Sequence, residues 1–546
     1  MSVVTEPAAA TRNPAWLRTV AVSIALAGLA IGYLVLLRAP AVGTFHDDGI
    51  YLVTAKALAE GQGYRIISVP GDPPQTKYPV LFPWLLSLAW RASPSFPANI
   101  LWLRLVPLGA MLIWLRLSWA LLRRLGASTT QATVIVLLTA VSPWVAFLST
   151  TLMSETLFAA LLAGVLLMVT RVCQGDGRRF EPLLAGLLAG AAILTRVAGI
   201  APAAAGVVVF LWSRRSVAAA QYLLGVLVTA VPWFWWAHYQ NPIATSVDPY
   251  YSATNYASWN VLTSYSWAEK FDIIAANLFQ AGFALLSIWK VSIPLVPLLP
   301  LALAIGGLAL VAPAFWRMRG QPAVPIILAY CGIHIAWVWP FLRFAVPVAP
   351  FLLWFTFLGA GRSRRIGYLG ALALFALGGV QVGALVKQAS EQGIVSPFAE
   401  VEDWNETARL LDWVSQNTSK DAVLTGNLDP VYYMFTGRKA IRAFSADPLL
   451  LFYDLRGQSE NPLGSVNDFQ NRLVSTKSDY LIMTAATGFA EVPHLNGLVS
   501  ELSQKCPGSL APIATNVVPA HMIYRIDRRR LERHDGCRRD VRSEVN

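Results

Sequence analysis

Residues 100–124 read ILWLRLVPLGAMLIWLRLSWALLRR, an apolar run that ends in two arginines. A helix needs about 20 apolar residues to cross the hydrocarbon core of a bilayer, so this run is long enough to span one. The positive-inside rule then assigns Arg123 and Arg124 to the cytoplasmic side. Similar runs recur through the first 387 residues, so the stretch belongs to a polytopic membrane protein.

The composition agrees with this assignment. The chain has 546 residues, 55% of them hydrophobic and 14% charged, whereas soluble proteins carry about 25% charged residues. The net charge of +12 lies mainly in short basic clusters between apolar runs, so no nucleic-acid partner is expected. Acidic residues concentrate beyond residue 387. We therefore predict an all-α polytopic membrane domain over residues 1–387, followed by a small soluble α/β domain over residues 388–546.

About eleven transmembrane helices are expected. The basic pairs between alternate spans place the N-terminus in the cytoplasm and the C-terminal domain outside it, as in a bacterial inner membrane. Two polar stretches, near residues 39–99 and 239–275, then face outward, and the apolar segments 79–91 and 275–290 suit interfacial helices. The expected spans lie near residues 16–38, 100–122, 129–148, 156–173, 182–197, 199–212, 218–238, 293–315, 322–340, 344–360 and 366–386.

The C-terminal part changes its pattern. Residues 403–417 have the periodicity of an amphipathic helix, residues 421–426 and 480–483 are typical of strands, and residues 430–435 suit a helix. In an extracytoplasmic domain, Cys506 and Cys537 can form a disulfide.

An acidic pair follows the first span, in Phe45-His46-Asp47-Asp48-Gly49-Ile50-Tyr51. Two adjacent carboxylates beside a membrane can hold a divalent metal such as Mg or Mn, or one of them can act as a general base. Burial or mutual repulsion would raise the pKa of one of them. Asp47 and Asp48 also suit the N-terminus of a helix, because acids there favour the helix dipole. The two interpretations are compatible.

Two further signals lie near the expected outer face. Lys77 and Tyr78 precede Pro79 and an apolar segment, where a lysine suits a phosphate or simply extends to the membrane surface. Glu155 is the one acid between residues 73 and 175. An isolated acid at membrane depth indicates function, although a helix cap or an interhelical hydrogen bond is the alternative.

Arginines within apolar segments give a third signal. Arg343 lies at an expected outer turn, against the positive-inside trend, and its guanidinium suits a lipid phosphate. Arg104 and Arg196 are further candidates, and each can instead pair with a carboxylate such as Glu155. The second outer stretch is rich in aromatic residues, which suit sugar stacking or a membrane-interface belt; they include Tyr250, Tyr251, Tyr256, Trp259, Tyr265 and Trp267.

The order of these signals resembles the C-type (GT-C) membrane glycosyltransferases, in the branch of the protein O-mannosyltransferases and the lipid A aminoarabinose transferase. In that branch the first outer loop opens with an acidic pair and a tyrosine, as Asp47-Asp48 and Tyr51 do here. The later motifs, which the family has in the same order, are matched by Lys77-Tyr78-Pro79, Arg104, Ser154-Glu155, Thr195-Arg196 and Arg343-Phe344 with Pro347. The resemblance covers roughly residues 20–360. No Trp-Trp-Asp motif of the oligosaccharyltransferases occurs.

The resemblance implies an inverting glycosyltransferase of the cell envelope that uses a polyprenyl-phosphate-linked sugar. The acceptor would be a glycan, a lipid or a protein at the outer membrane face. Asp47 would be the base, assisted by Asp48, and the substrate-binding residues would be Tyr51, Lys77, Tyr78, Arg104, Glu155, Arg196 and Arg343. A secondary transporter and a non-catalytic subunit that binds lipid-linked sugar are the alternatives; transporters usually have repeated halves, and no repeat is seen here.

Overall fold

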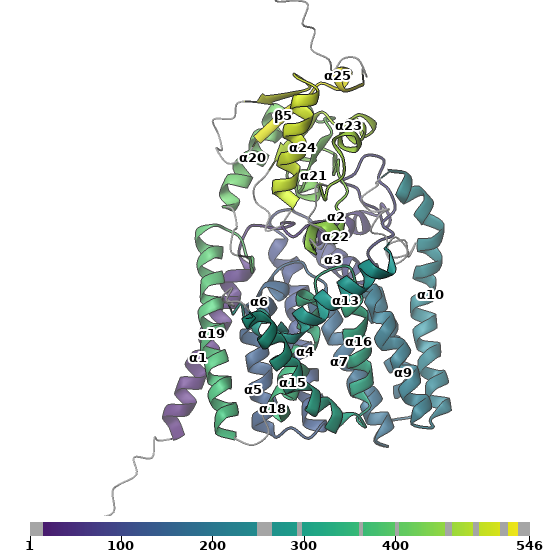
Figure 1. Cartoon of the computed structure of the whole chain (residues 1–546), viewed down its shortest axis with the longest axis vertical. Helices are drawn as coiled ribbons and strands as arrows, with labels where there is room; N and C mark the ends of the chain where they lie inside the picture. The colour runs from purple at the N-terminus through teal and green to yellow at the C-terminus, as the bar shows by residue number, and fades with distance from the viewer. Residues whose placement is uncertain are drawn as a thin grey trace, which may run out of the picture.

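A computed structural model describes residues 15–247, 265–291, 298–359, 364–398, 403–453, 461–483, 491–513 and 522–532. A tall bundle of helices carries a small α/β domain at one end, with short helices lying between the two (Figure 1). The predicted fold class, an apolar helical region followed by a mixed α/β region, is confirmed at this level of detail.

The bundle is built from apolar helices. Six of the described helices are long and apolar enough to cross a membrane, or seven if the bent pair α5–α6 counts as one span. The protein is thus a multi-pass membrane protein. The bundle helices are α1 (Ala15–Leu37), α4 (Ile100–Arg124), α5 (Thr129–Val141), α6 (Pro143–Thr150), α7 (Glu155–Cys173), α8 (Glu181–Thr195), α9 (Ile200–Trp212), α10 (Ser216–Val247), α15 (Leu299–Met318), α16 (Ala323–Ile335), α18 (Ala349–Gly359) and α19 (Arg364–Glu391).

Three boundaries differ from the predicted ones. The span predicted at 129–148 bends by 66° between α5 and α6, because Pro143 has no backbone N–H to continue α5 and starts a new helix instead. The helix α10 continues to Val247, beyond the predicted loop start at 239. The helix α19 runs to Glu391, past the predicted domain boundary at 387.

The segments predicted as interfacial helices form short helices. These are α3 (Leu81–Ala92) in the first loop, and α13 (Trp267–Gly282) with α14 (Ala284–Ile288) in the second. The first loop also contains α2 (Asp47–Ala59). Figure 1 shows α2 and α3 between the bundle and the α/β domain. Of the aromatic residues predicted in the second loop, Tyr250, Tyr251, Tyr256 and Trp259 lie outside the described residues.

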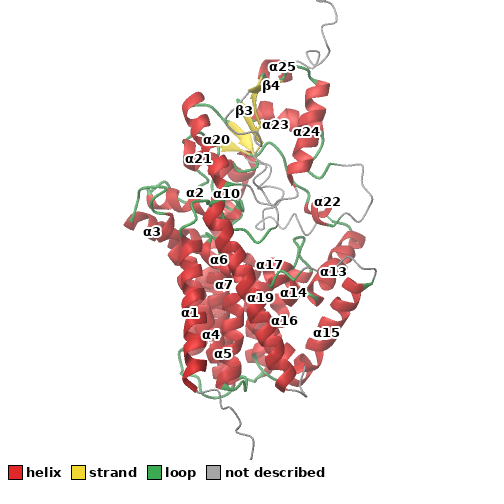
Figure 2. Ribbon diagram, turned by 90° about the vertical axis from the view of Figure 1, so that its left-hand side faces the viewer, coloured by secondary structure: helices red, strands yellow, loops and turns green. Residues whose placement is uncertain are grey.

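The C-terminal domain has a five-stranded mixed sheet in the order β2-β1-β3-β5-β4. The strand β1 pairs in parallel with β2 and β3, and β5 pairs antiparallel with β3 and β4. The strands are β1 (Leu424–Gly426), β2 (Ala440–Ile441), β3 (Tyr480–Met483), β4 (Leu510–Ile513) and β5 (Met522–Ile526). The helices are α20 (Trp404–Asn417), α21 (Asp429–Thr436), α22 (Pro448–Phe452), α23 (Val466–Ser475), α24 (Glu491–Lys505) and α25 (Arg528–Glu532). Figure 2 shows α20, α21, α23 and α24 around the sheet, whereas α22 lies below it, near α13.

Sequence periodicity located these elements well. The predicted helices at 403–417 and 430–435 and the strands at 421–426 and 480–483 correspond to α20, α21, β1 and β3. Cys506 is buried, while Cys537 lies outside the described residues. The disulfide between them stays a prediction.

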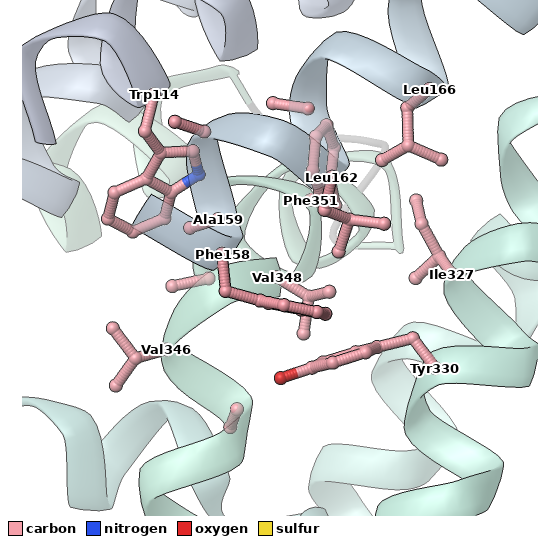
Figure 3. Packing of buried hydrophobic residues seen from close by; sticks show 14 of the residues in the cluster. Trp114, Phe158, Ala159, Leu162, Leu166, Ile327, Tyr330, Val346, Val348 and Phe351 are labelled. Atoms are coloured by element: carbon pink, nitrogen blue, oxygen red, sulfur yellow. The ribbon is translucent and has the colours of Figure 1, made fainter. Parts of the chain in front are cut away.

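The bundle core extends to the turn that carries Arg343. The rings of Phe158 and Tyr330 stack with their centroids 5.4 Å apart (Figure 3). The hydroxyl of Tyr330 donates a 2.8 Å hydrogen bond to the carbonyl of Phe344. Phe344 belongs to the short helix α17 (Leu342–Ala345), which the 3₁₀ turn Val346–Val348 joins to α18. The core therefore fixes the turn that carries Arg343.

Small residues bring α8 and α10 into close contact. A Cβ added at Gly186 would lie 2.0 Å from the carbonyl oxygen of Tyr222, and one at Gly225 would lie 2.6 Å from that of Leu183. In lipid, helix association depends on such close packing, because the surrounding acyl chains are as apolar as the side chains.

We expect Gly186→Ala to lower the unfolding free energy by about 1–3 kcal/mol, the usual effect of overpacking. Gly109→Ala in α4 is the matched control, since a Cβ there meets nothing within 4 Å. Alanine is also the better helix former, by about 1 kcal/mol. Thermal unfolding of the detergent-solubilised protein, followed by tryptophan fluorescence, measures both. Equal unfolding temperatures for the two variants would contradict the close contact.

Candidate active site

The site is built where the first loop meets the ends of the bundle helices. Asp47 is the first residue of α2, and Glu155 is the first residue of α7. Arg343 lies in α17, just before the bundle helix α18. These residues are almost 300 positions apart in sequence, and their side chains meet in one cluster.

The Arg343 guanidinium joins the two carboxylates. Its Nη2 donates a 2.6 Å hydrogen bond to Oδ2 of Asp47. Its Nε lies 2.7 Å from Oε1 of Glu155, a close ion pair that lacks the geometry of a hydrogen bond. The guanidinium also lies over the ring of Phe45, 5.0 Å from its centroid. Arg343 is thus held by charge on two sides and by an aromatic ring on a third.

Glu155 holds a second arginine. The Arg196 Nη1 donates a 2.7 Å hydrogen bond to Oε1 of Glu155 and a 3.2 Å bond to the hydroxyl of Ser154. Arg196 reaches this position because α8 ends at Thr195, and the backbone of Arg196 is extended. The pairing with Glu155 that the sequence offered for Arg196 is present. Ser154 also contacts the hydroxyl of Tyr51, at 3.1 Å.

Lys77 and Tyr78 complete the cluster. The Tyr78 hydroxyl donates a 2.6 Å hydrogen bond to Oδ1 of Asp47. The Lys77 ammonium lies 5.1 Å from the centroid of the Tyr78 ring, and the Lys77 side chain is buried. The side-chain oxygen of Gln75 accepts hydrogen bonds from the backbone N–H groups of Lys77 and Tyr78. Gln75, which sequence reasoning gave no role, therefore shapes the turn that presents them.

The electrostatic state of Asp47 follows from these contacts. Burial raises the pKa of its carboxyl, but the charges of Arg343 and Lys77 and the hydrogen bond from Tyr78 together bring the pKa well below its usual range. Asp47 is therefore a carboxylate at neutral pH. The cluster contains two carboxylates and three cationic side chains, so it carries an excess of positive charge that favours an anion.

Asp48 has a different environment from Asp47. Its two carboxylate oxygens accept hydrogen bonds from the backbone N–H groups of Gly43, at 2.8 Å, and Phe45, at 3.0 Å. Burial raises the pKa of Asp48 to about 6, against the effect of these two bonds. The sequence placed Asp47 and Asp48 in one catalytic pair, whereas the structure directs Asp48 to the loop backbone.

The pair does not fit a shared metal ion in this arrangement. Asp47 is engaged by Tyr78 and Arg343, and Asp48 by two backbone amides. Within the described ranges, no group of three or more His, Cys, Asp or Glu side chains is placed to hold a metal. The predicted metal site at Asp47 and Asp48 is thus not supported by the donors that surround them.

Arg104 is not brought into the cluster. It is buried in α4, and its guanidinium donates hydrogen bonds to the carbonyls of Leu37, Ala39 and Ala41. Leu37 is the last residue of α1, where a helix leaves its C=O groups without partners, and Ala39 and Ala41 lie in the segment that follows. Arg104 thus supports the chain that leads into the first loop.

Sequence reasoning missed His46 and Asp429, which contact each other next to Asp47. The Nε2 of His46 lies 3.1 Å from Oδ1 of Asp429, in the α/β domain. His46 stands in the quoted acidic motif, but nothing local in the sequence links it to a residue 383 positions away.

We expect Glu155→Gln to destabilise the protein, because two arginines would lose their shared carboxylate. Breaking a buried ion pair costs about 3–5 kcal/mol, and the partial exposure of both arginines, 15% and 18% of their side chains, favours the lower end. Glu181→Gln is the matched control, since its partner Arg171 is 37% exposed. The unfolding temperature should therefore fall further in Glu155→Gln than in Glu181→Gln. Equal unfolding temperatures would argue against the shared ion pair.

Comparison with known proteins gives similarity at the level of structure. No protein-family model and no curated protein sequence matches the chain. ArnT from Cupriavidus metallidurans in the apo state is 16% identical over 93% of this chain and 98% of its own, with a TM-score of 0.47. The oligosaccharyltransferase AglB from Archaeoglobus fulgidus is 12% identical over 84% and 69%, with a TM-score of 0.47. The arabinofuranosyltransferase AftD from Mycobacteria is 15% identical over 92% and 40%, with a TM-score of 0.41. The chain is similar in fold to these GT-C membrane glycosyltransferases, at 12–16% identity over 84–93% of its own length.

Proposed function

We propose that this protein is a membrane glycosyltransferase that moves a sugar from a polyprenyl-phosphate donor to a hydroxyl group of a glycan, lipid or protein acceptor. The observation that carries the proposal is the Arg343 guanidinium bridging Asp47 and Glu155 at the helix ends. A buried cluster of this kind combines a base with cations that can hold a leaving phosphate. The order of sequence motifs supports the same chemistry.

The cations suit the phosphate of a lipid-linked donor. Arg343 and Arg196 present planar guanidinium groups, which match phosphate oxygens, and Lys77 adds a compact positive charge. Arg196 follows the end of α8, Arg343 lies in the turn before α18, and Lys77 lies in the first loop. A polyprenyl chain can therefore remain in lipid while its phosphate reaches all three. Among the described residues, the buried Oε2 of Glu155 has no hydrogen-bond partner, which leaves it ready to accept one from a sugar hydroxyl.

The reaction is a single displacement at the anomeric carbon. The acceptor oxygen forms a bond to that carbon as Asp47 takes the hydroxyl proton. The bond between the carbon and the phosphate oxygen breaks, and the electron pair leaves with the polyprenyl phosphate. Lys77 and Arg343 stabilise the charge that develops on the phosphate, usually the largest contribution to such a rate. Attack from the opposite face inverts the configuration.

Donor binding would also activate the base. In the resting arrangement the cations hold the pKa of Asp47 low, and a weakly basic carboxylate is a poor proton acceptor. A bound phosphate would also pair with Lys77 and Arg343. Their electrostatic stabilisation of the Asp47 carboxylate then weakens, and the pKa of Asp47 rises. The base becomes effective when the leaving group is in place.

The proposed topology has eleven spans, an N-terminus in the cytoplasm and the C-terminal domain outside a bacterial inner membrane. The four shorter apolar helices and the bent pair, taken with the six long ones, support that count. Figure 1 shows α2, which begins at Asp47, at the same end of the bundle as the α/β domain. The acceptor would then be met on the outer face.

The direct test offers purified protein in nanodiscs a panel of polyprenyl-phosphate sugars with a crude membrane acceptor extract. Wild type should release free polyprenyl phosphate from one donor. Asp47→Asn should lower that turnover by about 10²–10⁴-fold, the usual scale for a general base. Asp176→Asn, in the loop between α7 and α8 where Asp176 pairs with Arg124, is the control and should retain wild-type turnover. No release from any donor would refute the transferase, and equal release by Asp47→Asn would remove Asp47 from the reaction.

The pH dependence tests base activation by the donor. The profile of kcat/KM reports the free enzyme and that of kcat the bound complex. Because the pKa of Asp47 is low in the free protein and rises when phosphate shares its cations, the acid limb of kcat should lie about 1–3 pH units above that of kcat/KM. Acid limbs at the same pH would show that the donor leaves the base unchanged.

A further inference from the structure

The backbone that enters Asp47 has an unusual conformation. His46 has φ 62° and ψ −55°, and the N–H of Asp47 donates a 2.8 Å hydrogen bond to the carbonyl of Phe45. These values define a γ-turn of the rare, strained kind, centred on His46. A non-glycine residue stays in such a conformation when its surroundings over-determine it. The direction of the Asp47 carboxylate depends on this turn.

The α/β domain supplies a contact that holds the turn. The His46 ring is buried, and its Nε2 lies 3.1 Å from Oδ1 of Asp429, the first residue of α21. Burial, followed by the nearby charge of Arg442, lowers the pKa of His46 below its usual value. A neutral ring with its proton on Nε2 donates that proton to the Asp429 carboxylate.

Asp429 is itself held by an ion pair with Arg442. The Nε of Arg442 lies 3.5 Å from the same Oδ1 of Asp429. The Arg442 Nη1 lies 3.2 Å from Glu491, and its Nη2 donates a 2.8 Å hydrogen bond to the carbonyl of Asn427. The side chains of Asp429, Arg442 and Glu491 are all buried, and all three residues belong to the C-terminal domain. The domain therefore presents Asp429 from a rigid, charge-paired support.

The backbones approach closely at the same place. A Cβ added at Gly43 would lie 2.6 Å from Val431, and one at Gly49 would lie 2.9 Å from Pro430. Both glycines flank the acidic motif, and both contacts are with α21. The strand β2 adds a further link, since the N–H of Ala440 donates a 2.8 Å hydrogen bond to the carbonyl of Ser68 in the first loop.

We infer that Asp429 is a positioning residue for the reaction: by holding His46 it keeps the γ-turn and aims the Asp47 carboxylate. The C-terminal domain is thus a working part of the catalytic site, in addition to any contact it makes with the acceptor. The inference rests on the proposed function for its catalytic consequence, and on the His46–Asp429 contact for its structural one.

The kinetic test compares three full-length variants in nanodiscs. Asp429→Ala removes the acceptor for His46 and should lower kcat about 10- to 100-fold, the scale for a small misplacement of a catalytic group. KM for the lipid donor should stay unchanged, because the cations that hold the phosphate are untouched. Asp429→Asn keeps an oxygen that accepts from His46, so it should restore most of kcat. Glu491→Gln weakens the ion pair of Arg442, which in turn contacts Asp429, but it leaves the His46–Asp429 contact in place. It should keep kcat near wild type, even if it lowers the unfolding temperature.

A kcat for Asp429→Ala equal to wild type would overturn the inference. Equal losses of kcat in Asp429→Ala and Glu491→Gln would also overturn it, because they would indicate general destabilisation of the domain.

A spectroscopic readout separates this inference from the proposed function. The chain has six histidines, and in protein labelled with ¹⁵N-histidine the substitution His46→Gln identifies the His46 signal. That signal should report a neutral, Nε2-protonated ring at pH 7 in wild type and in Glu491→Gln, and it should change in Asp429→Ala. An unchanged signal would refute the contact. If wild type releases no polyprenyl phosphate while the signal behaves as expected, the proposed function fails and the structural link between domain and loop stands.

Discussion

The shared ion pair at Arg343 is the interaction on which the arrangement of the site depends. Arg343 cannot be buried at the end of a membrane helix without negative partners, because a lone charge in a low-dielectric setting is strongly unfavourable. Asp47 and Glu155 supply these partners from two other segments of the chain. The same need for charge pairing therefore fixes the first loop, α7 and the turn before α18 relative to one another. The cluster keeps an excess of positive charge, which favours an anion.

The surrounding structure makes that ion pair geometrically possible. Tyr330, stacked on Phe158 in the bundle core, holds the carbonyl beside Arg343. Arg104, which lies outside the cluster, supports the segment between α1 and the acidic motif through backbone carbonyls. Residues outside the cluster thus decide where its charged groups lie. Two arginines that look alike in sequence have different tasks, one electrostatic and one structural.

The acidic motif shows how one short segment combines these requirements. Asp48 binds the loop backbone, and Asp47 faces the cations. His46 precedes them in a strained turn, and its ring contacts Asp429 of the α/β domain. This contact joins the first loop to the α/β domain, through a residue 383 positions further along the chain.

Sequence alone determined the class of protein and much of its local structure. Apolar runs, basic pairs and helical or alternating periodicity depend on near neighbours, so they indicated the membrane helices and located α20, α21, β1 and β3 correctly. The same patterns singled out Asp47, Lys77, Glu155, Arg196 and Arg343, because a charge in an apolar context stands out without a structure. Tertiary structure alone decided which of these side chains meet, that Arg104 stays apart, that Asp47 and Asp48 have different partners, and that His46 meets Asp429. Such contacts join residues tens to hundreds of positions apart, and they depend on how helices pack and where the chain turns, which no local pattern encodes.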